Sequence, residues 1–593
     1  MACANVVDIM RESALRWPDR PAQRYWTGSH WQDRSYRELW EAIQSVARGL
    51  KTLGIQPGDR VGLLARTRPE WVIADYAILC ADAVTVPIYP TSSVDDVAHI
   101  ATDAQIGWAV VENDQLAEKL PENVGRIFIE TSKGEHPLTL DTLSTPGDAL
   151  LPMRSGGDVA TLVYTSGTTG RPKGVMLTHQ NLLTNVEDIV SITNTTPQMT
   201  LTAADVCLSL LPLSHILERT CHNVFLDRGV TIAYARSPQQ LAADLKSIRP
   251  TLMVVVPRVL EKIYERINAE VATASGFKRR LFQHTLVLGE QRYQRLIEAK
   301  SAPTCRLREE AWLDRAVSHR IREAVGGRLR LVISGGAPLS ADIGRFFFAL
   351  GIPVLEGYGL TETAPVLTVN RLPVPRFGSV GQPLPQVSIR IADDGEILAR
   401  GPNISPGYWN QPEKTAAAFS DGWFHTGDVG WVTHDGYLVV ADRKKLLIVL
   451  STGKNVAPQR VEQKLMLSPA IDQAVVVGNN RKYVAALIYV SPTWVNEWGR
   501  KRGLDPLSYQ EAIGREDLLA EVFREVQRTT RDLAPFERPK TVRLLPQPLA
   551  EETGELTPSL KVKMAVVEQK YGALIEDMYT AEHDQPLETL RGS

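Results

Sequence analysis

Cysteine is scarce in this sequence, and the few cysteines are poorly placed for cross-linking. The chain has 593 residues and five cysteines, which lie far apart and form no C-x-x-C pair. This spacing predicts neither a disulfide framework nor a cysteine zinc site. A chain of this kind suits a reducing compartment, and we expect it in the cytoplasm.

A long apolar run is also missing. The most apolar stretch, residues 71–88, contains Asp75 and Asp82, so we predict no membrane-spanning helix. The first residues lack the basic-then-apolar order of a secretory signal, which again favours a soluble protein. Two questions stay open at this point: peripheral association with the inner face of the membrane, and the oligomeric state, monomer or homodimer.

An excess of one charge is absent too. The formal net charge is -2, so no basic field attracts nucleic acid, and we predict no nucleic-acid partner. This balance still allows a local basic patch that holds phosphate groups. The length of 593 residues exceeds what one hydrophobic core organises, so we expect at least two domains.

The spacing of apolar residues alternates between helical and strand-like periods in the first half of the chain. Helices are predicted at 36–53 and 71–81, and a long charged stretch at 260–324 is predicted to form solvent-facing helices. This alternation favours an α/β fold with largely parallel sheets. The predicted strands are 60–64, 84–89, 252–256 and 329–334.

The pattern of predicted secondary structure changes near residue 389. Short strands with glycine turns, such as Asp393-Asp394-Gly395, run as far as Asp442, and the basic cluster Arg443-Lys444-Lys445 follows. The last quarter of the chain is typical of a smaller α/β segment, with strands at 474–477 and 485–490. We therefore predict two domains, residues 1–441 and 442–593.

The strongest local signal is LVYTSGTTGRPKGV, residues 162–175. An apolar strand runs into glycines that let several backbone N–H groups converge on one anion, while the hydroxyls donate further hydrogen bonds. Lys173 adds a point charge suited to phosphate oxygens. This is not a Walker A loop, because Lys173 is followed by Gly174 rather than by Ser or Thr. The alternative for such a cluster is a flexible polar turn.

Together with three later segments, this loop resembles the signature of the adenylate-forming (AMP-binding) superfamily. EGYGLTET at 356–363 is similar to the family's adenine and magnesium segment, GWFHTGD at 422–428 to its ribose segment, and DRKK at 442–445 to its interdomain hinge. The matches occur in order over most of the chain. The resemblance implies a large, multi-subdomain N-terminal domain with parallel sheets, a smaller mobile C-terminal α/β domain, and the use of ATP, Mg²⁺ and coenzyme A.

The resemblance also assigns roles in the nucleotide site. The loop ending at Lys173 would grip the β- and γ-phosphates, and Tyr358 would stack on the adenine. Glu362 would bind Mg²⁺, Thr361 would donate to the α-phosphate, and Asp428 would accept both ribose hydroxyls. The alternatives are a packed core aromatic for Tyr358, a helix-start carboxylate for Glu362 and a turn-capping carboxylate for Asp428. The predicted cofactor-binding residues are Thr165, Ser166, Gly167, Thr168, Thr169, Gly170, Lys173, Gly335, Gly336, Ala337, Glu356, Gly357, Tyr358, Gly359, Thr361, Asp428, Arg443, Lys445 and Gly453.

The family places a catalytic lysine near its C-terminus, where it reaches the carboxylate and the α-phosphate. Here that region is GELTPSLKVKM, residues 554–564, and it departs from the commoner Gly-Lys pattern because Glu555 follows the glycine. Lys561 is our choice and Lys563 the fallback, while a solvated surface lysine is the alternative for either.

Roles in the second half-reaction follow from the same resemblance. Lys445 matches the hinge residue and Arg443 a nucleotide contact, although such a basic run is often only exposed charge. Gly453 would let the backbone approach the pantetheine arm of coenzyme A after the small domain rotates.

Two segments resemble the long-chain fatty acyl-CoA synthetase branch: LPLSHILER at 211–219 and VPRVLEK at 256–262. The resemblance implies an ATP-dependent long-chain fatty acid:CoA ligase, which forms an acyl-adenylate and pyrophosphate and then acyl-CoA and AMP. Its alternatives are an acyl-AMP ligase that loads a carrier protein, and a catalytically silent acyl- or nucleotide-binding protein. His215 would line the acyl pocket, or else be a satisfied core histidine. The predicted catalytic residues are Lys561, Thr361, Glu362 and His215, with Glu362 also the metal ligand.

Overall fold

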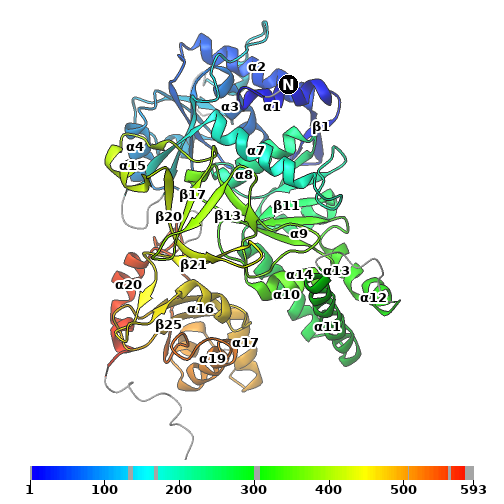
Figure 1. Ribbon diagram of the computed structural model, residues 1–593, viewed down its shortest axis with the longest axis vertical. Coiled ribbons are helices and arrows are strands. Elements are labelled where there is room, and N and C mark those ends of the chain that lie inside the picture. The colour runs from blue at the N-terminus through cyan, green and yellow to red at the C-terminus, as the bar shows by residue number, and fades with distance from the viewer. Residues whose placement is uncertain are drawn as a thin grey trace, which may run out of the picture. The chain divides into compact units, whose positions relative to one another are not determined.

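The computed structural model describes residues 3–130, 138–165, 171–299, 308–504, 507–557 and 562–580. The chain divides into two compact units, which Figure 1 shows as one ribbon coloured along the chain. The larger unit comprises Met1–Arg390, Leu398–Thr426 and Val432–Val439. The smaller unit comprises Ile391–Ile397, Gly427–Trp431 and Val440–Ser593. The chain therefore passes between the units several times rather than once.

Two large sheets form the larger unit, and the first has seven strands within the described residues. Its central strands β7, β4, β3, β5 and β6 pair in parallel, while β8 and β18 are added antiparallel at one edge. Every residue of β4 is buried, as expected for a strand covered on both faces. In sheet order the strands are β18 (Gly407–Tyr408), β8 (Lys173–Thr178), β7 (Val159–Thr165), β4 (Val84–Ile88), β3 (Arg60–Leu64), β5 (Trp108–Val111) and β6 (Gly125–Phe128).

The second large sheet has nine strands within the described residues. The run from β13 to β1 is parallel, and β14, β15 and β2 are antiparallel additions at the two edges. The expectation of an α/β fold with largely parallel sheets is thus confirmed. In sheet order the strands are β15 (Gln382–Pro383), β14 (Val366–Val369), β13 (Val354–Gly359), β12 (Leu331–Ser334), β11 (Leu252–Val255), β9 (Val206–Ser209), β10 (Thr231–Tyr234), β1 (Pro21–Trp26) and β2 (Trp31–Ser35).

Helices connect these strands, and their ends follow local sequence signals. The predicted helix at 36–53 is α2, which starts after Ser35 in a capping box with Glu38 and ends just before Gly54, a residue with φ of 90°. The helices of the larger unit are α1 (Val7–Arg16), α2 (Tyr36–Thr52), α3 (Pro69–Cys80), α4 (Val94–Asp103), α5 (Asp114–Ala117), α6 (Leu140–Leu143), α7 (His179–Thr193), α8 (Ile216–Asp227), η1 (Pro238–Gln240), α9 (Leu241–Ile248), α10 (Pro257–Ala272), α11 (Gly276–Ala299), α12 (Arg308–Leu313), η2 (Asp314–Ser318), α13 (His319–Ala324), α14 (Ala341–Ala349), η3 (Thr361–Thr363) and α15 (Pro412–Ala418).

One hydrophobic core contains side chains from helices that connect strands of both large sheets. It includes Trp71 on α3, which follows β3 of the first sheet, and Phe225 on α8, which follows β9 of the second. Within it, the Arg219 guanidinium on α8 makes two hydrogen bonds of 2.8 and 2.6 Å to the Asp75 carboxylate on α3. Both side chains are almost fully buried. A buried, bidentate ion pair therefore fixes α8 against α3.

The structure gives each of the two acids in the apolar stretch at 71–88 a partner. Asp75 pairs with Arg219, and Asp82, in a left-handed turn between α3 and β4, accepts from the Met153 N–H at 2.7 Å. The stretch is thus a buried helix followed by a buried strand. Within the part of the chain that the structure describes, no helix combines the length and the apolar character that crossing a bilayer requires.

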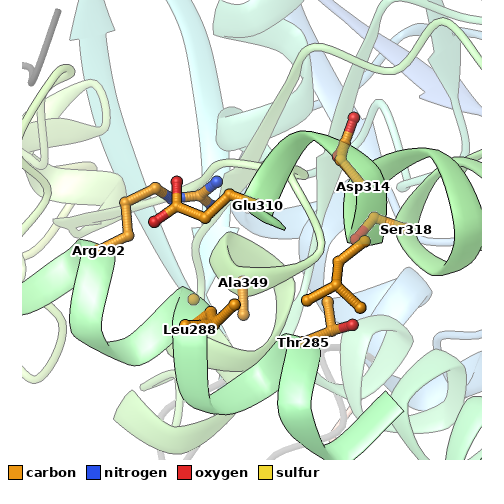
Figure 2. A pocket seen from close by; sticks show the side chains of 9 residues that line it. Thr285, Leu288, Arg292, Glu310, Asp314, Ser318 and Ala349 are labelled. Carbon is orange, nitrogen blue, oxygen red and sulfur yellow. The ribbon is translucent and has the colours of Figure 1, made fainter. Parts of the chain in front are cut away.

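The charged stretch predicted to be helical forms α10, α11, α12, η2 and α13, with residues 300–307 outside the described part. Helix α11 lies beside α14 (Figure 1). They approach closely at Gly289, where a Cβ atom would stand 2.2 Å from the Cβ of Ala349. A cavity of about 20 Å³ lies beside this contact, with Arg292 and Glu310 at one end and Asp314 and Ser318 at the other (Figure 2). It has room for about one water molecule and is lined by none of the predicted site residues.

The smaller unit contains the predicted strands at 474–477 and 485–490. They lie in β24 and β25, which pair antiparallel, and β26 joins β25 in parallel. Four of the described strands carry the chain between the units: β16 (Ser388–Ile391), β17 (Glu396–Arg400), β20 (Trp423–Val432) and β21 (Leu438–Arg443). The short strand β19 (Phe419–Ser420) pairs with β20 inside the larger unit. The remaining elements are β22 (Ile448–Val449), β23 (Asn455–Val456), α16 (Pro458–Leu465), β24 (Ile471–Val477), β25 (Ala485–Val490), α17 (Pro492–Lys501), α18 (Tyr509–Ile513), α19 (Glu516–Thr529), β26 (Val542–Leu544) and α20 (Met564–Asp577).

The Asp75–Arg219 pair yields a stability prediction. Arg219→Met should leave the Asp75 carboxylate buried without its counter-charge, which costs about 3–5 kcal/mol. Thermal unfolding should therefore show a large fall in melting temperature. Arg37→Met is the matched control, because Arg37 pairs with Asp19 in an exposed ion pair, and such pairs contribute about 0–1 kcal/mol. Similar falls in the two variants would contradict the prediction.

Candidate active site

The hydroxyl- and glycine-rich segment connects two antiparallel strands. Thr165, the last residue of β7, pairs with Lys173, the first residue of β8, while Ser166, Gly167, Thr168, Thr169 and Gly170 lie outside the described residues. The returning arm is held by His99 on α4, whose Nε2 lies 3.1 Å from the Pro172 carbonyl oxygen. The two strands that flank the segment are therefore held in a fixed register.

Lys173 is linked to Glu362 through an aromatic side chain. Its ammonium lies 4.8 Å from the ring centroid of Tyr408, and the Tyr408 hydroxyl donates to Glu362 Oε1 at 2.9 Å. Tyr408 is on β18, which pairs with β8, so its position follows from the sheet. Burial, and then the Glu362 charge, raise the pKa of Tyr408, so the hydroxyl stays protonated as a donor. Two segments far apart in the sequence thus meet here.

Glu362 and Thr361 belong to η3, a single 3₁₀ turn that follows β13. Glu362 lies in the first turn of this 3₁₀ helix, so its role as a metal ligand, rather than as a helix-start carboxylate, stays a prediction. Its approach to the sheet requires Gly359, because a Cβ atom there would lie 1.8 Å from the Pro365 carbonyl oxygen. The Glu362 carboxylate is partly exposed, which leaves it accessible to a ligand.

The predicted adenine walls lie at the ends of two adjacent parallel strands. Ser334 of β12 pairs with Glu356 of β13, so the Gly335 to Ala337 loop stands beside Gly357 and Tyr358. A β-bulge between Tyr358 and Gly359 interrupts the pairing of β13 with β14. Bulges re-aim side chains at functional sites. Tyr358 also packs on a small hydrophobic cluster, so its role as an adenine platform stays a prediction.

Glu356 supports this loop from below. Its buried carboxyl accepts from the Leu339 N–H at 2.8 Å, which ties the end of the 335–339 loop to β13. Burial raises the pKa of Glu356 to about 8. The sequence placed Glu356 among the cofactor-binding residues, and the structure gives it a contact that shapes the wall of the site.

His215 stands at the N-terminus of α8. Its Nδ1 accepts from the Leu217 N–H at 3.2 Å, which satisfies one free donor of the helix. Leu217 in turn lies next to Gly335, where a Cβ atom would be 3.1 Å from Leu217 Cδ2. His215 thus has a capping role beside the predicted adenine wall, and its role in an acyl pocket stays a prediction.

The predicted ribose and hinge residues lie in the smaller unit. Asp428 is buried, and Arg443 Nε lies 3.4 Å from its Oδ1. The neighbouring Asp442 accepts from the Arg443 N–H at 2.6 Å. Burial, and to a smaller extent the charge of Asp428, raise the pKa of Asp442 to about 6. Asp428 and Arg443 are therefore brought together, as two nucleotide contacts would need to be.

The residues of the basic run at 443–445 differ in their ion-pair partners. Lys444 and Lys445 are both exposed, and Lys444 binds Asp394 at 2.5 Å and Glu396 at 3.1 Å. Gly453 lies in the turn between β22 and β23 with φ of 77°, and no atom of the described residues lies within 4 Å of where its Cβ would be. The backbone at Gly453 is thus open to close approach.

Lys561 lies outside the described residues, so its position is not tested. Lys563 immediately precedes α20, and its N–H donates to the Glu555 carbonyl at 2.8 Å. The Glu555 side chain is buried and binds Lys570 and Thr553. The departure from the Gly-Lys pattern therefore places at position 555 a buried carboxylate that binds Lys570 of α20.

The sequence pattern of the family described as "AMP-binding enzyme" matches residues 10–409, and that of "AMP-binding enzyme C-terminal domain" matches residues 445–583. The first alone covers more than half of the chain. The chain belongs to the AMP-binding enzyme family.

Relatives of this AMP-binding enzyme share nearly its whole length. It is 38% identical over 595 residues to long-chain-fatty-acid–CoA ligase FadD15 of Mycobacterium bovis, covering 98% of this chain and 97% of that one. It is 30% identical to long-chain-fatty-acid–CoA ligase 1 of Homo sapiens, covering 95% and 84% of the two chains. It is 31% identical to long chain acyl-CoA synthetase 3 of Arabidopsis thaliana, covering 94% and 88%.

Solved structures share the fold of this AMP-binding enzyme. The adenylation domain of a carboxylic acid reductase from Segniliparus rugosus, in complex with AMP and a co-purified carboxylic acid, matches with a TM-score of 0.76, 21% identity and coverage of 97% and 94%. O-succinylbenzoate coenzyme A synthetase from Bacillus subtilis, in complex with AMP, matches with a TM-score of 0.65, 22% identity and coverage of 95% and 97%. At these identities the likeness establishes the adenylate-forming fold alone.

Sequence reasoning missed Tyr408. The only local signal for a constrained position is Gly407 before it, which has φ of 143° and leaves no room for a side chain beside Thr415. Nothing in the spacing of residues 407–409 indicates that this strand pairs with β8. The link from Lys173 to Glu362 depends on that pairing.

Glu356 yields a pH prediction for this AMP-binding enzyme. Its folded-state pKa is raised to about 8, so its contribution to stability is greatest in acid and is lost as the pH rises from about 4.5 to about 8. Glu356→Gln keeps the acceptor for the Leu339 N–H and removes this titration. The melting temperature of the variant relative to the wild type should therefore rise from about pH 5 to about pH 8. A difference that stays constant with pH, as expected for Glu413→Gln on the exposed face of α15, would contradict it.

Proposed function

We propose that this protein is an ATP-dependent long-chain fatty acid:CoA ligase, which forms an acyl-adenylate and then acyl-CoA. The observation that supports this most is that long-chain-fatty-acid–CoA ligases resemble the chain over nearly its whole length, with 38% identity to the mycobacterial relative. The arrangement of Lys173, Tyr408 and Glu362 supports the same reaction, because it brings a cation and a carboxylate to one tyrosine side chain, and ATP phosphates and a metal ion need such partners.

In the first half-reaction, the residues of the larger unit would hold ATP. The hairpin between Thr165 and Lys173 would bind the β- and γ-phosphates, and Tyr358 would stack on adenine opposite the Gly335 to Ala337 loop. The ionised fatty acid needs no general base. Its oxygen forms a bond to the α-phosphorus as the bond to the β-phosphate oxygen breaks, and pyrophosphate leaves. Thr361 would donate to the α-phosphate.

A magnesium ion fits this site as a partner of Glu362. In the described residues no three His, Cys, Asp or Glu side chains converge, so Glu362 would be a single protein carboxylate among phosphate oxygens and waters. This ligand set is typical of Mg²⁺ bound with a nucleotide, and the ion would neutralise charge on the departing pyrophosphate. Glu362 would hold it, and Tyr408 would orient Glu362.

In the second half-reaction, residues of the smaller unit would contact AMP and coenzyme A. Residues 442–593 would form the mobile C-terminal domain, with Lys445 as the hinge and Asp428 and Arg443 on the ribose side of AMP. The thiol of coenzyme A would pass the open backbone at Gly453, form a bond to the acyl carbonyl carbon and lose its proton, while AMP leaves. We further propose that the enzyme works in the cytoplasm or at the inner face of the membrane, where fatty acids partition.

Two assays test the proposed function. With ATP, Mg²⁺ and a long-chain fatty acid, purified protein should release pyrophosphate, and added coenzyme A should convert the product to acyl-CoA and AMP. Each buried methylene contributes about 0.8 kcal/mol, so a panel of acids should show KM falling with chain length until the tunnel is filled. Pyrophosphate release with acyl transfer only to a carrier protein would favour the acyl-AMP ligase. Absence of acid-dependent release would favour a silent binding protein.

The two candidate lysines form a matched pair for a further prediction. Lys561→Ala should lower pyrophosphate release by about 100-fold or more, because it removes a charge aimed at the reacting carboxylate and α-phosphate. Thioester formation from supplied acyl-adenylate should be retained. Lys563→Ala should keep both half-reactions, since the backbone N–H bonded to Glu555 is unchanged. Equal loss of both half-reactions in Lys561→Ala, or loss of adenylation in Lys563→Ala alone, would overturn the assignment.

A further inference from the structure

The side chain of Tyr408 lies between the two charged groups assigned to the phosphates and the metal ion. One face of its ring receives the Lys173 ammonium at 4.8 Å, and its hydroxyl donates to Glu362 Oε1 at 2.9 Å. Tyr408 is 8 % exposed and its partners Lys173 and Glu362 are half-buried, so both contacts are partly shielded from bulk water. Cation–π contacts and charge-assisted hydrogen bonds are stronger in such surroundings.

Several contacts fix the position of Tyr408. Its N–H donates to Thr415 Oγ1 at 3.0 Å, and its ring meets Phe419 edge-on with a centroid separation of 5.9 Å. Ser405 Oγ accepts from the Gly407 N–H at 3.0 Å and donates to the Met176 carbonyl on β8 at 2.7 Å. Tyr408 is therefore held by β8, α15 and the Ser405 turn.

Glu362 is held from two sides. Its side chain accepts from Tyr408, and its backbone carbonyl accepts from the Ser405 N–H at 2.8 Å. Ser405 and Tyr408 belong to one short segment, which thus orients both the main chain and the carboxylate of Glu362. Because η3 is only a single turn, it cannot fix the carboxylate by itself.

We propose that Tyr408 is a positioning residue for adenylation, which couples the phosphate-loop lysine Lys173 to the metal-binding carboxylate Glu362. This inference rests on the proposed function. The hydroxyl aims one oxygen of Glu362 and leaves the other to face the metal ion. The ring holds the Lys173 ammonium at the mouth of the hairpin. A magnesium ion demands near-octahedral geometry, so a carboxylate free to rotate binds it less well.

Tyr408→Phe separates the two contacts, because it keeps the ring under Lys173 and removes the hydroxyl. The half-saturating Mg²⁺ concentration for pyrophosphate release should rise about three- to tenfold, the range expected for one lost hydrogen bond, with KM for ATP at saturating Mg²⁺ little changed. Binding of Mn²⁺ in the presence of ATP, followed by electron paramagnetic resonance, should weaken by a similar factor. This readout does not depend on turnover.

Tyr408→Leu removes both contacts and should also raise KM for ATP. Tyr164→Phe is the matched control, because Tyr164 is a part-buried phenol on the neighbouring strand β7 that donates to Asp103 at 2.5 Å and touches neither Lys173 nor Glu362 by hydrogen bond. The control should leave the Mg²⁺ and Mn²⁺ responses unchanged. If Tyr408→Leu does not fold, the conservative Tyr408→Phe still decides the question.

The outcomes distinguish this inference from the proposed function. If wild-type protein releases pyrophosphate but Tyr408→Phe shows unaltered metal dependence, or loses melting temperature and turnover without any change in metal dependence, the positioning role is overturned. If Glu362→Gln and Tyr408→Phe affect Mn²⁺ binding independently, so that their combined effect is the product of the two, the coupling through Glu362 is overturned. If wild-type protein shows no acid-dependent release, the proposed function fails first.

Discussion

The antiparallel pairing of β8 with β7 on one side and β18 on the other is the constraint on which the candidate site depends. The first pairing closes the hairpin and sets Lys173 opposite Thr165. The second brings Tyr408 beside Val175, two residues along β8 from Lys173. Because Tyr408 also reaches Glu362, a single sheet edge determines where a cation, a phenol and a carboxylate stand. Without β18, Lys173 and Glu362 would have no common support from this edge.

Parallel strands place the other wall of the site. The ends of β12 and β13 lie side by side, and the chain leaves them through the Gly335 loop and the bulge at Tyr358. Ligands in open α/β sheets bind at such carboxyl ends. The 335–339 loop is held to β13 by the Glu356 carboxyl, which accepts from the Leu339 N–H. This carboxyl is buried so deeply that it keeps its proton at neutral pH. The hydrogen bond to the Leu339 N–H partly offsets the cost of burying the Glu356 carboxyl and fixes the loop.

Much of this could be predicted from the sequence, because the signals are local. Helix α2 follows from the helical spacing of its apolar residues and the glycine beyond its end, and β3 and β4 follow from short apolar runs. The glycine- and hydroxyl-rich loop was found from its residue types, and the 356–363 and 422–428 segments from their resemblance to a known family. The antiparallel return strand β8 was not predicted. What could not be predicted are pairings between distant segments. The Asp75–Arg219 ion pair, the Tyr408–Glu362 hydrogen bond and the Glu555–Lys570 contact each join positions whose spacing carries no signal.

Helix α8 shows why residue type alone cannot settle the state of a buried charge. Glu218 and Arg219 are neighbours, and both are buried. The Arg219 guanidinium donates to both oxygens of the Asp75 carboxylate, which forms a bidentate pair. Glu218 accepts from the Ser209 hydroxyl at 2.6 Å and has no buried cation paired with it among the described residues apart from His222, 3.7 Å away. Burial raises the pKa of Glu218 to about 8, so it keeps its proton at neutral pH. One turn on, burial lowers the pKa of His222 to about 4, so it is neutral as well. Around this turn, α8 thus carries one charge that Asp75 compensates and two side chains, Glu218 and His222, that are uncharged at neutral pH.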